Sequence, residues 1–327
     1  MISLIGMMVS FLLLYLFTLL STNPSLITIS FIGALIARII YGCTASGIVP
    51  ACQHWATLIC GSENRLKAIT SVSIGLSAGR LIGPLVAIAA LKVSPYAALC
   101  LMVVLPAISL TMIAAHPAPE VSQQREKTSA NLPWLPGKKY LPYLVCAITL
   151  CVGIALLQYS FSPLILSITD WSTSQVSDVI GILLTISAAC TFAVQTLIVK
   201  ARKVTPIGMF RTGAIMFSCG FVLFLAPNIW CYGIAMAIVS SGAALLVPAY
   251  TSEATSKQPD APGTVAGYIA TSHTIGYGLA SLLAFTATLA PIYPIYLGIG
   301  CSILIAVITY LLSKNADDSR GSEHCES

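Results

Sequence analysis

The chain has 327 residues, of which 57% are hydrophobic and only 8% are charged, with a formal net charge of +5. Soluble domains carry about 25% charged residues, so this composition excludes a water-soluble globular protein. The apolar runs are long and lack the alternation of β-barrel strands, which predicts helices that face lipid. We therefore expect an all-α integral membrane protein whose first partner is the lipid bilayer.

The remaining composition argues against enzymatic and nucleic-acid functions. Basic residues fall in short loops, where membrane orientation explains them better than nucleic-acid binding does. The 11 cysteines lie mostly inside apolar runs and resemble ordinary small apolar residues. The chain contains no nucleotide-binding loop, no HExxH motif and no Ser/His/Asp set at recognisable spacing. We expect no enzyme activity, no bound metal or cofactor, and no nucleic-acid partner.

Apolar runs of the length needed to cross the hydrocarbon core, about 20 residues, predict ten membrane helices. Their expected ranges are 2–20, 27–49, 67–92, 95–115, 141–166, 177–199, 207–226, 229–251, 264–289 and 292–312. The first range is not interpreted as a signal peptide, because it lacks a basic region before the apolar run and a cleavage site after it.

Basic residues alternate from loop to loop along the chain. They gather in 61–67, 116–140, 200–206, 252–263 and the polar tail 313–327, whereas the intervening loops hold Lys92 alone. The positive-inside rule places the basic loops and the C-terminus in the cytoplasm. The short loops favour a bacterial inner membrane, and we expect a multi-pass monomer.

The longest loop divides four helices from six. We expect an N-terminal half at 1–116, a cytoplasmic linker at 117–140 that is rich in proline, a C-terminal half at 141–312 and a frayed cytoplasmic tail at 313–327.

An internal repeat relates the two halves. Residues 49–57 and 247–255 share the pattern VPA-x4-AT, and after a one-residue slip Gly79 aligns with Gly276. The two copies lie six helices apart, as in transporters built from two same-direction repeats of six helices. Since the first half has four helices, we expect two more to precede Met1, lost through a misplaced start or a true truncation. The alternative is that such short motifs match by chance.

Two segments resemble signatures of the major facilitator superfamily. Arg38-x-x-Tyr41-Gly42 resembles the fourth-helix signature Arg-x-x-Gln-Gly, with Tyr41 in place of Gln. The family's loop signature between its second and third helices would fall before Met1.

The second segment, 79–87, resembles the fifth-helix signature Gly-x-x-x-Gly-Pro-x-x-Gly, with Ala87 in place of the last Gly. That signature belongs to exporters of the drug:proton antiporter type, and 46–87 also resembles exporters of siderophores. The resemblance implies a twelve-helix fold, alternating access and export of a small molecule driven by a proton gradient. Uptake of an organic anion and a truncated, non-transporting membrane fragment are the alternatives.

A stripe of small residues runs along the helix 67–92. Gly75, Gly79 and Gly83 recur every four residues, and Pro84 follows. Small residues let a second helix approach closely in lipid, and proline permits a bend. Helix packing alone and packing combined with gating are both open for this stripe, and the resemblance favours gating. Gly42 on the preceding helix is assigned the same role.

Arg38 and Arg80 lie near the middle of predicted spans, where an arginine costs at least about 2.5–3.5 kcal/mol. None of the 11 acidic residues falls in the middle of a span. Water, backbone carbonyls, the absent helices or an anionic substrate remain as partners, and the last option predicts cargo such as a carboxylate. The secondary candidates for substrate contact are Gln158, Tyr159, His273 and Tyr277.

Overall fold

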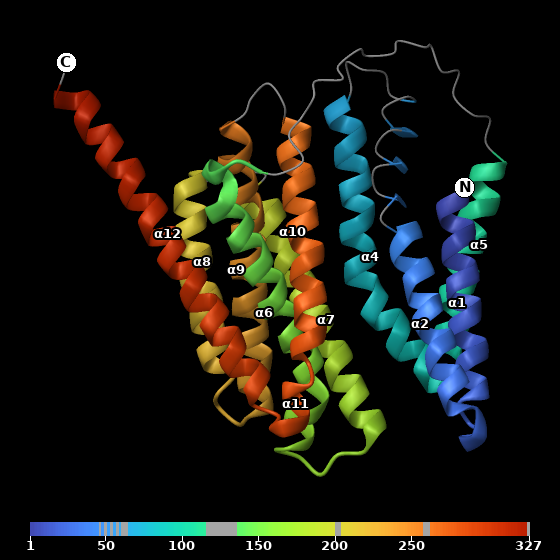
Figure 1. Ribbon diagram of the computed structural model, residues 1–327. Helices are drawn as coiled ribbons and strands as arrows, with labels where there is room; N and C mark the ends of the chain where they lie inside the picture. The colour runs from blue at the N-terminus through green and yellow to red at the C-terminus, as the bar shows by residue number, and fades with distance from the viewer. Residues whose placement is uncertain are drawn as a thin grey trace. The chain divides into compact units, whose positions relative to one another are not determined.

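A computed structural model describes residues 1–45, 47–48, 51–52, 55–56, 59, 65–115, 136–199, 204–257 and 262–325 of the chain. These residues form two compact units, Met1–Lys127 and Thr128–Ser327 (Figure 1). The described residues are helical, with turns between the helices and no strand. The expected linker, 117–140, lies outside the described residues except for 136–140, so the expected domain boundaries stay a prediction.

In its described residues, the first unit has four long helices: α1 (Ile2–Leu20), α2 (Ile27–Ala45), α4 (Arg65–Val93) and α5 (Ala97–Ala114). A short 3-10 helix, η1 (Pro24–Leu26), joins α1 to α2, and Asn23 caps it by accepting a hydrogen bond from the Ser25 backbone. α1 packs against both α2 and α5. Gly33 receives the Phe17 ring, which shows how a missing side chain brings two membrane helices together.

α4 bends along its length (Figure 1). Pro84 lies inside this helix. Because proline lacks the backbone N–H and its ring crowds the preceding turn, it gives α4 a local cause for bending. The helix packs against α5 over only part of its surface, and Gly79, Gly83 and Leu85 are exposed.

The second unit contains α6 (Leu141–Leu166), α7 (Thr173–Val194), α8 (Pro206–Leu223), α9 (Ile229–Ser256), α10 (Pro262–Leu283) and α12 (Tyr293–Cys325). Shorter elements are the 3-10 helix η3 (Lys138–Tyr140), the π-helix η4 (Gln195–Val199) and α11 (Thr286–Leu289). α6 packs against α10 and α12, whereas α9 packs against α7 and α8.

The core of the second unit lies around α6, α8 and α9. Phe161, Phe217, Phe221, Phe224 and Tyr232 are among its fully buried side chains. α8 and α9 approach at a pair of glycines, since a Cβ atom on Gly242 would lie 2.8 Å from the Gly213 carbonyl oxygen. Close backbone contact and interlocking aromatic rings therefore hold this unit together.

The two units share a pattern of internal pairing. In the first, α1 packs on α2 and α5; in the second, α8 packs on α9 and α12. This agreement is what a repeat of six helices predicts. In such a repeat, α1 corresponds to α8, α2 to α9 and α5 to α12. The same register equates α4 with α10.

Eight helices of the described chain are long and apolar enough to span a membrane. The protein is therefore an all-helical, multi-pass membrane protein. α4 and α10 are helices at the other two expected ranges, 67–92 and 264–289, and the count of ten spans with its division into four and six stays a prediction.

Several helix ends differ from expectation. α7 begins at Thr173 rather than 177, because Ser172 and Gln175 form a reciprocal capping box at its start. α9 continues through Pro248 to Ser256, so the repeated proline lies inside the helix and does not end it. α12 continues to Cys325, so the prediction of a frayed tail at 313–327 is wrong over 313–325.

Candidate functional site

A partly buried hydrogen bond joins α9 to α10 in the second unit. The hydroxyl of Tyr250 and Nε2 of His273 lie 2.6 Å apart. Their rings meet edge to face, with centroids 5.9 Å apart. Tyr250 is completely buried and His273 is half-buried. His273 is thus a positioned side chain with one nitrogen engaged by the phenol.

Polar contacts also run between α6 and α10. Tyr277 shares a side-chain hydrogen bond with Cys151 of α6. The hydroxyls of Tyr159 and Ser281 lie 3.1 Å apart. Tyr159 and Tyr277 are each about half exposed, at 47% and 48%. We call Tyr159, Tyr250, His273 and Tyr277, with Cys151 and Ser281, the polar cluster.

The polar cluster exists because α10 approaches α6 closely. A Cβ atom on Gly276 would lie 2.5 Å from the carbonyl oxygen of Ile148 and 2.8 Å from Cβ of Cys151. Ser272 and Ala280, one turn to either side of Gly276, are also buried. This small-residue face fits against α6 and leaves the larger polar side chains beside the contact.

Three members of the polar cluster, Tyr159, His273 and Tyr277, are residues that the sequence suggests for substrate contact, and that role stays a prediction. Gln158 is exposed beside Tyr159, and no hydrogen bond joins its side chain to another residue in the described part of the chain. Tyr250, Cys151 and Ser281 were missed. Tyr250 directly follows the repeated VPA of 247–249, which is the one local signal that marks it. The partners come from different helices, so local patterns do not identify the others.

The two arginines lie in the first unit. Arg38 is on α2 and Arg80 is on α4, and both side chains are exposed. No ion pair joins either arginine to another residue among those that the structure describes. In the register of the repeat, Gly79 aligns with Gly276, so Arg80 corresponds to Tyr277. The same position thus carries a cation in one unit and a member of the polar cluster in the other.

The glycines predicted to pack or gate have no close neighbour among the residues that the structure describes. A Cβ atom on Gly42, Gly75, Gly79 or Gly83 would meet no described atom within 4 Å, and Pro84 is half-buried. Close approach in the first unit occurs instead at Gly33 and at Gly6, which faces Thr44. The packing and gating role of the stripe on α4 stays a prediction.

Removing the Tyr250 hydroxyl is expected to destabilise the second unit. In Tyr250→Phe, Nε2 of His273 loses its partner in a half-buried site, and an unsatisfied buried polar group costs about 1–3 kcal/mol. Tyr159→Phe is the matched control, because it also deletes a bonded hydroxyl but at an exposed position. Thermal unfolding of the two purified variants measures the difference. Equal midpoints would show that the hydrogen bond between Tyr250 and His273 adds no more stability than the exposed one between Tyr159 and Ser281.

The described residues contain no group of three or more His, Cys, Asp or Glu side chains that could hold a metal ion. The cations and polar side chains in the membrane helices are suited to binding a solute through charge and hydrogen bonds. They do not form a recognisable set of catalytic groups.

Comparison with protein families identifies the class. The model of the Major Facilitator Superfamily matches residues 1–281, which include all of the first unit and most of the second. A search of curated proteins found no match. The family consists of secondary transporters rather than enzymes, and its match agrees with the helical membrane architecture. The chain belongs to the Major Facilitator Superfamily.

Proposed function

We propose that this transporter exports a small anionic molecule, such as a carboxylate siderophore, drug or metabolite, by alternating access in exchange for protons. The observation that carries the proposal is the placement of Arg38 and Arg80 within the helices α2 and α4. Arg38 lies about 16 Å along α2 and Arg80 about 22 Å along α4, at about 1.5 Å per residue.

These positions are costly for a cation that faces hydrocarbon. An arginine at the bilayer centre costs at least about 2.5–3.5 kcal/mol, and such residues normally face a cavity or a partner. α2 and α4 contain no acidic residue. A substrate carboxylate bound by the guanidinium groups would supply the missing negative charge through two-pronged, charge-assisted hydrogen bonds.

The polar cluster of the second unit supplies a different chemistry. Its phenols and imidazole donate and accept hydrogen bonds without a fixed charge. We assign it to recognition of the neutral hydroxyl or carbonyl groups of the cargo, with Tyr159 and Tyr277 as the accessible members. Gln158 is included as an exposed neighbour.

The direction of transport rests on the resemblance of 79–87 to the signature of proton-coupled exporters. The proton gradient is the proposed energy source, with no bound cofactor. The basic loops support a cytoplasmic C-terminus. The short loops favour a bacterial inner membrane, where we expect the protein to act as a monomer. Uptake of an organic anion would use the same arginines, so the direction needs its own test.

Export is expected to follow a proton gradient in reconstituted vesicles. Purified protein is placed in liposomes with citrate, succinate and benzoate on the cytoplasmic side, and a gradient acidic on the opposite side is imposed. At least one carboxylate should cross toward the acidic side, and an uncoupler should stop it. Movement only in the reverse sense would establish uptake, and no movement of any anion would contradict the proposal.

A further inference from the structure

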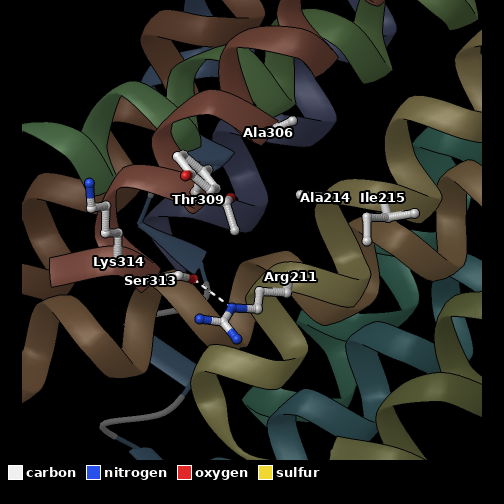
Figure 2. Close-up of a pocket in the computed structure, with 8 residues that line it drawn as sticks. Arg211, Ala214, Ile215, Ala306, Thr309, Ser313 and Lys314 are labelled. Atoms are coloured by element: carbon white, nitrogen blue, oxygen red, sulfur yellow. Dashed lines mark hydrogen bonds between the residues drawn. The ribbon is translucent and has the colours of Figure 1, made fainter. Parts of the chain in front are cut away.

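A groove with two cations lies between α8 and α12 in the second unit (Figure 2). Its volume is about 590 Å³. Arg211 of α8 and Thr309, Ser313 and Lys314 of α12 supply its polar groups. The transport proposal does not use these residues, and none of them belongs to the polar cluster.

The polar end of the groove is shaped for an anion. Nε of Arg211 on α8 donates a hydrogen bond to Oγ of Ser313 on α12, and the two atoms lie 2.9 Å apart. This bond orients the guanidinium group beside the groove, as Figure 2 shows. Lys314 adds a second positive charge, and among the residues that the structure describes the groove lining contains no acidic side chain. An incoming phosphate would meet two cations and nearby hydroxyl donors.

The two cations lie at the depth of the lipid headgroups. α8 begins at Pro206, so Arg211 lies about 7 Å along it, at about 1.5 Å per residue. The apolar span of α12 runs from Tyr293 to Lys314 and ends at that lysine. The start of α8 and the end of the α12 span therefore lie at the same membrane surface. Basic side chains near the ends of membrane helices extend toward the headgroups.

The rest of the groove is apolar and faces outward. Ala214 and Ala306 are small residues that leave space between the helices. Ile215 and Tyr310 are 64% and 68% exposed. In a membrane, such side chains contact acyl chains, because lipid is the medium around an exposed apolar helix face. A charged end and an apolar channel together match a lipid better than a soluble ion.

We propose that this groove binds an anionic phospholipid, with its phosphate held by Arg211 and Lys314 and its acyl chain along Ile215 and Tyr310. The basic loops place this end of α8 and α12 at the cytoplasmic leaflet, where anionic lipids attract basic segments. The bound lipid would bridge α8 and α12 beside the Arg211–Ser313 hydrogen bond.

Native mass spectrometry of the full chain tests the site with two lipids of identical chains, dioleoyl phosphatidylglycerol and dioleoyl phosphatidylcholine. The wild type should retain phosphatidylglycerol preferentially. The double variant Arg211→Gln with Lys314→Gln should reduce that retention on the order of tenfold or more. Each basic residue near a membrane surface strengthens the attraction to anionic lipids, and the variant removes two of them. The matched control is Lys92→Gln with Lys257→Gln, which also removes two exposed cations.

A second variant keeps both charges. Ala306→Phe fills the apolar part of the groove and should lower retention of the lipid in a protein that still elutes as a folded species. Equal losses in the groove and control variants, or no loss in either groove variant, would overturn the proposal. Displacement of the lipid by millimolar inorganic phosphate would also overturn it, since it would identify a site for the free ion.

Discussion

Replacing Arg80 with alanine is expected to abolish transport of the anion while the protein still accumulates in the membrane. Arg80 is exposed on α4, so its removal disturbs little packing. Loss of one partner from a desolvated charge pair costs about 2–5 kcal/mol, which corresponds to more than tenfold in binding. Initial efflux rates in the carboxylate-loaded liposomes measure the effect.

Lys92→Ala is the matched control for this experiment. Lys92 is also an exposed cation on α4, but it lies in the last turn of the helix, at the membrane edge. Its loss should leave efflux nearly unchanged. Arg80→Lys retains the charge but loses the planar, two-pronged geometry, so an intermediate rate is expected. Wild-type efflux in Arg80→Ala would remove the argument for an anionic cargo.

Replacing Gly276 with leucine is expected to lower the stability of the protein more than Tyr250→Phe does. The new Cβ atom would lie 2.5 Å from the Ile148 carbonyl oxygen, and backbone atoms of a packed helix move less readily than a flexible side chain. Overpacking of a well-packed core costs about 1–3 kcal/mol and occasionally more. The yield of folded protein and the thermal midpoint should both fall, because α10 can no longer seat against α6.

The internal repeat offers a control at the equivalent position. Gly79 of α4 aligns with Gly276, but a Cβ atom there meets no described atom within 4 Å. Gly79→Leu should therefore preserve the thermal midpoint. A loss as large as that of Gly276→Leu would contradict this expectation and would show that a helix packs against the stripe on α4. Preserved stability with lost transport would support a gating role.

The sequence predicted the membrane class and most helix positions because these depend on local composition. A run of apolar residues long enough to cross the bilayer forms a helix wherever it lies, since lipid leaves its backbone groups no other partners. The range 141–166 thus matches α6 at both ends. Errors arose where a side chain decides the end, as with the cap at Ser172.

The sequence alone determined that the protein is a helical membrane protein with arginines inside α2 and α4, because composition can be read along the chain, and its motifs resemble those of a transporter family. The tertiary structure alone decided which side chains meet across helices. It joined Tyr250 to His273 and Arg211 to Ser313. It also placed Gly276 against α6, whereas Gly79 has no described atom within 4 Å of its Cβ position. The physical reason is that such contacts depend on the rotation and separation of two helices, which neither helix encodes by itself.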